Sequence, residues 1–287
     1  MAYNAHFRVK MANIAIRWSM ARAKRHYIPG QIWHLTHRCH KQEFLLKLVR
    51  DRRRWLQWLF EAKRRFGLII LNYTVTSNHI HLLVLDEGGR DVIPDSVKLV
   101  AGRTGQEYNQ RKKRKGAFWE DRYHATAIDS TDHLLRCLVY IDLNMVRAGV
   151  VSHPSEWTFG GYDEIQKTRR KCVLINYQRL AELTGFSTYE AFQKAHKDLV
   201  SESLANEKNS RQTQWTESIA VGNSSFIETI KKQLGILAGG RKVLEKDGGF
   251  QLREEVETYI AHSDTKMDDI DPKNSYIWDD NAYKSVC

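Results

Sequence analysis

The stretch Leu71-Asn-Tyr-Thr-Val-Thr-Ser-Asn-His-Ile-His-Leu-Leu-Val-Leu85 decides the fold of this chain. Its β-branched and aromatic residues are typical of strands, and the polar break at Thr76-Ser-Asn78 predicts a hairpin between two of them. Because residues two apart on a strand point to the same face, His79 and His81 lie side by side while Ile80 turns into the core. Such a pair can form half of a divalent-metal site. The alternative is two ordinary histidines at a sheet surface.

Patterns on both sides of this hairpin predict a run of alternating strands and helices. The expected elements are a strand at 31–37, a helix at 51–66, strands at 68–75 and 79–85, a helix from about 94 to 110, a strand at 123–128 and a helix at 130–148. The first six give the order βαββαβ, that of ferredoxin-like α+β domains. We therefore expect an antiparallel sheet with helices, in which strand 79–85 is central and the last helix is an addition.

A second motif, Tyr140-Ile-Asp-Leu-Asn144, lies in that added helix. The apolar residues around it recur at helical spacing, and Gly149 suits a C-terminal end. Tyr140 and Asn144 then lie one turn apart on one face. In one interpretation the carbonyl oxygen of Asn144 completes a metal shell, and Tyr140 presents its phenol to whatever the metal binds. The other interpretation is a Tyr-Asn pair on a solvated face.

Basic residues outnumber acidic ones by 45 to 34, which gives a formal charge of +11 and suits a polyanionic partner. Two runs concentrate this excess, one along the helix at 51–66 and one after the helix that ends near 110. A single run is often a solvated face, and isolated arginines often form structural ion pairs. The candidates for phosphate contact are Arg52, Arg53, Arg54, Arg111, Lys112, Lys113, Arg114, Lys115, Arg122 and Arg147.

Cysteine spacing and hydropathy bear on the compartment. The four cysteines form no C-x-x-C pair, which argues against a zinc ribbon or disulfide framework and for a reducing cytoplasm. No apolar stretch approaches the roughly 20 residues that cross a bilayer, and residues 1–19 do not resemble a signal peptide. Met20 is an alternative start. We expect a cytoplasmic protein without membrane contact.

Beyond residue 170 the pattern becomes mainly helical. Helices at 177–184 and 187–200, the second with a Ser187/Glu190 capping box, form either a DNA-reading helix-turn-helix or, as we favour, a hairpin packed on the core. Further helices are expected at 226–237 and 252–261. The predicted organisation is an N-terminal extension (1–21), a main domain (22–168), the helical hairpin (169–200), a linker (201–213) and a helical C-terminal region with an acidic tail (214–287).

Four ordered blocks together resemble the REP-associated tyrosine transposases, a branch of the HUH single-tyrosine transposase superfamily. They are Arg22-Ala-Lys-Arg-His-Tyr-Ile-Pro-Gly30 with Ile32-Trp-His-Leu-Thr36, Ser77-Asn-His-Ile-His-Leu-Leu83, Phe118-Trp-Glu-Asp-Arg-Tyr123, and the segment from Tyr140 to Val151. The resemblance covers about residues 20–165 and implies the ferredoxin-like HUH fold. One departure is Met145, where many relatives carry proline after the asparagine.

The resemblance also implies an activity. Mg²⁺ or Mn²⁺ held by His79, His81 and Asn144 would activate a phosphate for attack by Tyr140, giving a 5′-phosphotyrosine adduct and a free 3′-hydroxyl. The expected enzyme nicks and rejoins single-stranded DNA at palindromic hairpin repeats, as a monomer or homodimer. Two alternatives remain open at this point: a hairpin-binding regulator without strand transfer, and a metal-dependent nuclease that uses water.

Overall fold

The computed structural model of the protein describes residues 28–206, 212–246 and 248–254. The expected N-terminal extension, the alternative start at Met20, the first residues of the first resembling block and the acidic tail lie outside the described residues. Among the described helices, none has both the length and the apolar composition needed to cross a membrane.

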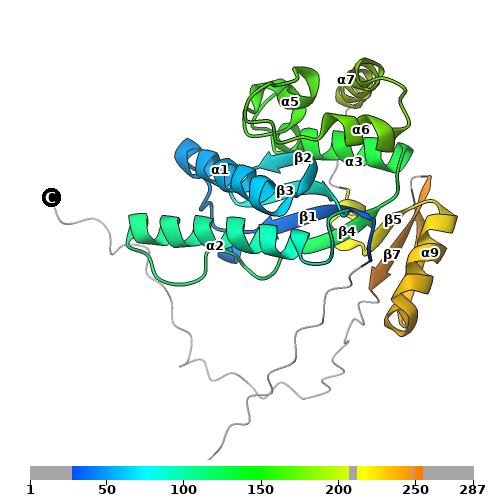
Figure 1. Ribbon diagram of the computed structural model, residues 1–287, viewed down its shortest axis with the longest axis horizontal. Helices are drawn as coiled ribbons and strands as arrows, with labels where there is room; N and C mark the ends of the chain where they lie inside the picture. The colour runs from blue at the N-terminus through cyan, green and yellow to red at the C-terminus, as the bar shows by residue number, and fades with distance from the viewer. Residues whose placement is uncertain (1–27, 207–211, 247, 255–287) are drawn as a thin grey trace, which may run out of the picture. The chain divides into compact units, whose positions relative to one another are not determined.

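Four strands form the core of the sheet. They are β1 (Ile32–Arg38), β2 (Ile69–Val75), β3 (His79–Leu85) and β4 (His124–Ile128), and they lie in the order β2-β3-β1-β4 with every pair antiparallel. Helix α1 (Val49–Phe66) precedes β2, and helix α2 (Val92–Lys112) precedes β4 (Figure 1). This is the ferredoxin-like α+β arrangement, so the predicted fold class and the central position of the third strand are confirmed.

The two faces of this sheet differ. Register pairs His34 with Leu83 and with Thr126, so these side chains share one face with His81, two residues from Leu83. The opposite face carries Leu35, Ile80 and Leu82, which pack with Trp55 and Leu59 of α1 and with Val100 of α2. Apolar burial against α1 and α2 thus anchors the same strands that carry the histidines.

The predicted helix at 130–148 is divided in two. Helix α3 (Asp132–Asp142) carries Tyr140, α4 (Asn144–Arg147) carries Asn144, and Leu143 between them has φ −77° and ψ 4°. The amide of Leu143 donates to the Val139 carbonyl at 3.0 Å, and that of Arg147 donates to the Leu143 carbonyl at 2.9 Å. The break therefore leaves the backbone coiled, and Tyr140 and Asn144 stay on neighbouring turns.

Three short or amphipathic helices follow, α5 (Tyr162–Gln166), α6 (Tyr177–Thr184) and α7 (Tyr189–Ala205). The latter two form the hairpin expected from the sequence, but Thr188 caps α7, accepting from the Ala191 amide, where Ser187 was expected. Helix α7 packs on α3 with a fully buried contact of 2.9 Å between Nε2 of His196 and Oδ2 of Asp142. It also extends into the segment that was expected to be a linker.

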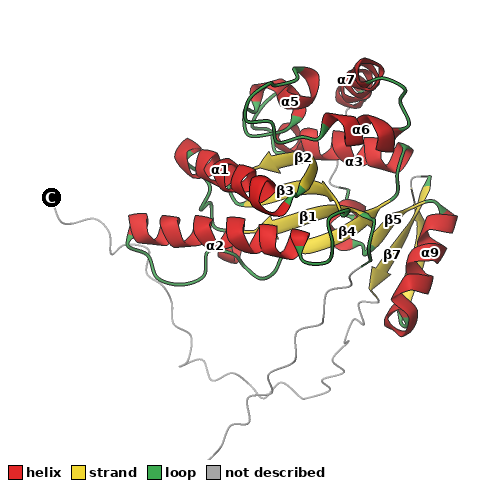
Figure 2. Ribbon diagram, viewed as in Figure 1, coloured by secondary structure: helices red, strands yellow, loops and turns green. Residues whose placement is uncertain are grey.

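The C-terminal region adds strands as well as helices. After α8 (Gln214–Glu217), strand β5 (Ala220–Gly222) pairs parallel with β4, and β7 (Gly249–Glu254) and β6 (Arg241–Lys246) extend the sheet beyond it (Figure 2). Helix α9 (Ser224–Leu234) lies between β5 and β6 in sequence. The helix predicted to begin at residue 252 is wrong over its first three residues, because Leu252 pairs with Ala220 in the sheet. The C-terminal region therefore contains both helices and strands. Within the described residues, the complete sheet has seven strands and is mostly antiparallel.

Candidate active site

The two motifs meet on the face of the sheet that α3 covers. The ring centroids of His79 and His81 are 5.0 Å apart, and the Tyr140 ring lies 5.9 Å from that of His81. The side-chain nitrogen of Asn144 lies 2.9 Å from Nε2 of His81. We call His79, His81, Tyr140 and Asn144 the candidate site.

The turn between β2 and β3 orients His79. Its Nδ1 lies 2.7 Å from the Asn78 side-chain oxygen and 3.0 Å from the Thr76 hydroxyl. The same hydroxyl donates to the His79 carbonyl at 2.9 Å, which closes the turn. These contacts fix the ring through Nδ1, so Nε2 would be its ligating nitrogen.

His34 of β1 supports His81 and was not predicted from the sequence. Its Nε2 lies 2.9 Å from Nδ1 of His81, and the two rings stack with centroids 5.0 Å apart. Its Nδ1 lies 2.8 Å from the carbonyl oxygen of Trp215 in α8. Burial lowers the pKa of His34 to about 3 and holds the pKa of His81 well below its usual value, with the neighbouring His79 adding to the effect on His81. Both rings are therefore neutral at pH 7, the state that metal ligation requires.

Tyr140 is only 6% exposed and has an arginine against its ring. The guanidinium carbon of Arg147 lies 4.1 Å from the ring centroid, and Arg147 also donates to the Tyr140 carbonyl at 2.5 Å. Burial lowers the pKa of Arg147, and Tyr140 acts in the opposite direction. Because the ordinary pKa of an arginine lies far above neutrality, this side chain keeps its charge near neutral pH. The Trp215 ring, 6.2 Å from the Tyr140 ring, encloses the site from another side.

The donor set fits a divalent ion. Within residues 28–206, 212–246 and 248–254, no group of three His, Cys, Asp or Glu side chains could hold a metal. A metal between the two histidines would therefore take Asn144 as its third protein ligand, through the amide oxygen. Imidazole and amide oxygen ligands are compatible with Mn²⁺ and Mg²⁺ that also bind phosphate.

Most of the predicted phosphate-binding residues lie away from this site. Arg53 and Arg54 are exposed on α1, on the other side of the sheet, and Arg54 forms an ion pair with Glu107 of α2. A cavity of about 360 Å³ between these helices is lined by Arg50, Arg53, Arg54 and Arg111 among others, and Arg111 pairs there with Asp51.

Arg52 departs from the prediction because its side chain is buried. It donates to the Leu46 and Lys47 carbonyls at 3.1 and 2.9 Å, and its guanidinium carbon lies 4.8 Å from the Trp157 ring centroid and 4.6 Å from that of Phe159. Its role in this structure is to tie the start of α1 to the loop that contains these two aromatic residues.

The second basic run and Arg122 also lie outside the candidate site. Arg114 is half-buried and donates to the Ala117 carbonyl at 2.8 Å, while Lys112, Lys113, Lys115 and Arg122 are exposed. Of the ten residues predicted to contact phosphate, Arg147 is the one with a described contact to Tyr140.

Comparisons with known proteins find similarity over part of the chain. Residues 29–144 match the family model described as transposase IS200 like. No curated protein matches the chain. Among solved structures, a REP-associated tyrosine transposase bound to a REP hairpin is 20% identical, with a TM-score of 0.44 over 55% of this chain and 92% of that chain. A putative transposase from Deinococcus radiodurans R1 is 19% identical, with a TM-score of 0.29 over 37% of this chain and 84% of that one.

The matched segment contains both motifs, from the histidine pair to the asparagine at its last position. Trp215, whose carbonyl contacts His34, lies beyond it. The match to the transposase IS200 like family model thus spans residues 29–144 and includes the whole candidate site, and it agrees with the resemblance of the motifs.

Proposed function

We propose that this protein nicks and rejoins single-stranded DNA at hairpin-forming palindromic repeats, with Tyr140 as the nucleophile. The observation that carries the proposal is the position of the Tyr140 ring, 5.9 Å from the His81 ring and directly against Arg147. Packing alone does not explain why the Tyr140 ring lies against the Arg147 guanidinium and beside the neutral imidazoles of His34 and His81. This arrangement supplies a nucleophile together with groups that can manage negative charge.

A divalent ion, Mg²⁺ or Mn²⁺, would be held by His79, His81 and Asn144. When bound by His79, His81 and Asn144, such an ion would supply positive charge to a nonbridging oxygen of the scissile phosphate. The turn contacts of His79 and the contact of His81 with His34 orient the two rings before any ligand binds. The protein thus contributes a preformed pair of nitrogen donors.

Tyr140 forms the new bond. A free phenol titrates near pH 10, so its proton must leave during the attack, and the adjacent Arg147 guanidinium favours the negative charge that develops on the phenol oxygen. The bond from phosphorus to the 3′-oxygen breaks, and that oxygen leaves as a 3′-hydroxyl after taking up a proton. Because the tyrosine ester keeps the phosphodiester linkage, a 3′-hydroxyl can reverse the reaction and join strands without ATP.

Burial of Tyr140 argues for a single-stranded target. Because the residue is only 6% exposed where α3 covers the sheet, a continuous duplex would clash before its phosphate reached the phenol. An unpaired strand beside a hairpin can enter as a thin chain. The formal charge of +11 supports a nucleic-acid partner, and a DNA substrate would place the protein at the nucleoid.

Substitution of the nucleophile tests the proposal. Tyr140→Phe removes one hydroxyl, so we expect loss of nicking and of an SDS-resistant protein–DNA adduct, with hairpin affinity within a few-fold of the wild type. The matched control is Tyr162→Phe, which alters another buried tyrosine that belongs to α5. It should retain both activities.

Two other outcomes of this experiment would favour the two alternative functions, a nuclease that uses water and a hairpin-binding regulator. Robust nicking by Tyr140→Phe would contradict the proposal and favour a nuclease that uses water. Tight hairpin binding by a wild-type protein that neither nicks nor forms an adduct would instead favour the regulator.

A further inference from the structure

A chain of hydrogen bonds connects the candidate site to a segment outside the IS200-like region. It runs from Asn144 to His81 at 2.9 Å, from His81 to His34 at 2.9 Å, and from His34 to the carbonyl oxygen of Trp215 at 2.8 Å. Both histidines are buried, His34 fully and His81 to within 3% of its surface. The contacts of His34 with His81 and with the Trp215 carbonyl are therefore shielded from competing water, and the contact of His81 with Asn144 is partly buried.

The carbonyl at the end of this chain determines the direction of every bond in it. A carbonyl oxygen can only accept, so His34 carries its hydrogen on Nδ1. Its Nε2 then accepts from Nδ1–H of His81, which leaves Nε2 of His81 as an acceptor beside Asn144. Nε2 is the nitrogen that faces Asn144, so it is the one that a metal between these residues would contact.

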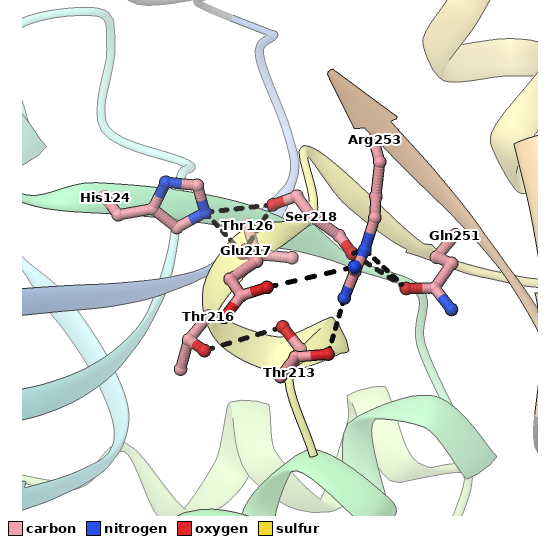
Figure 3. Close-up of polar contacts among 8 residues, drawn as sticks. All are labelled: His124, Thr126, Thr213, Thr216, Glu217, Ser218, Gln251 and Arg253. Carbon is pink, nitrogen blue, oxygen red and sulfur yellow. Dashed lines mark hydrogen bonds and ion pairs between the residues drawn. The ribbon is translucent and has the colours of Figure 1, made fainter. Parts of the chain in front are cut away.

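Thr126 of β4 contacts this carbonyl directly, and residues of β7 hold the flanking segment in place. The Thr126 hydroxyl lies 3.2 Å from the Trp215 carbonyl and 2.7 Å from the Ser218 carbonyl. Figure 3 shows the contacts at the two ends of α8: Arg253 of β7 donates to the Thr213 hydroxyl at 2.6 Å, and the Ser218 hydroxyl lies 3.1 Å from Gln251. Trp215 itself is fully buried. Helix α8 is thus fixed at both ends and at its centre.

We propose that His34, oriented by the Trp215 carbonyl, is a positioning residue that presents Nε2 of His81 to the metal. The C-terminal region, through α8, is then part of the active-site architecture. This inference rests on the proposed function, because it assumes that His81 is a metal ligand. Groups that orient a ligating histidine typically contribute a factor of about 10 to 100 in metal affinity.

Binding of Mn²⁺ alone, followed by electron paramagnetic resonance, measures the effect without DNA or turnover. His34→Leu removes the acceptor for His81, and we expect the Mn²⁺ dissociation constant to rise by about 10- to 100-fold. His34→Gln should stay within about threefold of wild type, because its side-chain oxygen can occupy the position of Nε2 and accept from His81. If His34→Leu does not fold, His34→Asn replaces it, since its shorter side chain cannot reach His81.

The matched control is His37→Leu. His37 is a second buried histidine of β1 whose ring nitrogen also contacts a backbone carbonyl, that of Asp121 at 2.7 Å, but it faces α1 and α2. Its loss should cost stability and leave Mn²⁺ affinity within twofold. A second readout is nitrogen NMR of histidine-labelled protein, in which His81 should carry its hydrogen on Nδ1 in the wild type and lose that preference in His34→Leu.

The outcomes separate this inference from the proposed function. Wild-type Mn²⁺ binding that does not depend on His81 would overturn both. If binding depends on His81 but His34→Leu matches the wild type in affinity and in the His81 tautomer, only the inference is wrong. Equal losses in His34→Leu and His37→Leu, or in His34→Leu and His34→Gln, would also overturn it, because general damage would then explain the effect.

Discussion

The two faces of the four-stranded core use the same strands for different purposes. Toward α3, β1 and β3 present His34 and His81, while toward α1 and α2 they present Leu35, Ile80 and Leu82. Alternation along a strand thus places a polar site directly behind an apolar core. Substitutions of adjacent strand residues should therefore have different effects. Those on the α3 face should lower DNA-cleaving activity, and those on the opposite face should lower the free energy of unfolding.

The largest contrast is expected between two adjacent residues of β3. His81→Ala removes a metal ligand, and we expect nicking to fall by roughly a thousandfold or more while the melting temperature changes little. Ile80→Ala deletes buried methyl groups, which should cost about 2–5 kcal/mol of the free energy of unfolding. The folded fraction of that variant should still nick DNA at close to the wild-type rate.

Removal of the metal should have the same effect as His81→Ala, a loss of nicking without a large loss of stability. Chelation of the wild type should abolish nicking, and added Mn²⁺ or Mg²⁺ should restore it. Asn144→Ala should lose less activity than His81→Ala, because water can replace a neutral oxygen ligand. Loss of nicking in Ile80→Ala without loss of stability would contradict the assignment of chemistry to one face and stability to the other. Nicking that survives chelation would contradict the metal site.

Arg147 should give an intermediate effect that appears in the pH dependence. Arg147→Met removes the cation 4.1 Å from the Tyr140 ring, and since that charge favours the phenolate, its loss should disfavour deprotonation. We expect single-turnover cleavage to slow by about 10- to 100-fold near pH 7, the range of a lost electrostatic or acid–base contribution. The pH of half-maximal cleavage should rise, so activity should recover in alkaline buffer.

Arg122→Met is the control for this experiment, because Arg122 is exposed and lies in the segment before β4. Its pH profile should match that of the wild type. An unshifted profile in Arg147→Met would indicate that Arg147 serves only to support the α3 backbone through the Tyr140 carbonyl.

The smallest effect is expected from the basic residues on the side of α1 and α2. Neutralising the exposed Arg53, Lys112 and Lys115 to glutamine should weaken DNA binding without slowing cleavage at saturating DNA. Each lost contact with a single strand should flatten the slope of log affinity against log salt by about 0.7. An unchanged slope would show that DNA does not reach this side of the molecule.

The sequence predicted the parts of the site that depend on local spacing. Strand β3 begins and ends where it was expected, since alternation and a polar turn define it, and Tyr140 and Asn144 share a face because four residues make about one helical turn. The βαββαβ order also followed from local patterns. Each of these features depends on the sequence of a single strand or helical segment and not on contacts between distant segments.

Features that depend on contacts between distant segments were missed. His34 meets His81 only because β1 and β3 pair in one particular register, and the Trp215 carbonyl is a backbone group that no sequence motif marks. Arg52 stood in a charged run, but stacking on Trp157 and Phe159 buries it. Leu252 was assigned to a helix, whereas pairing with β5 makes it part of a strand.

Mapping the covalent adduct tests the central claim most directly. The wild-type protein is incubated with hairpin-bearing single-stranded DNA and Mn²⁺, digested with nuclease and protease, and analysed by mass spectrometry. The account predicts a nucleotide linked through its 5′-phosphate to the peptide that contains Tyr140, and to no other tyrosine peptide. Nicked DNA that accumulates without an adduct, or an adduct on a different residue, would contradict it.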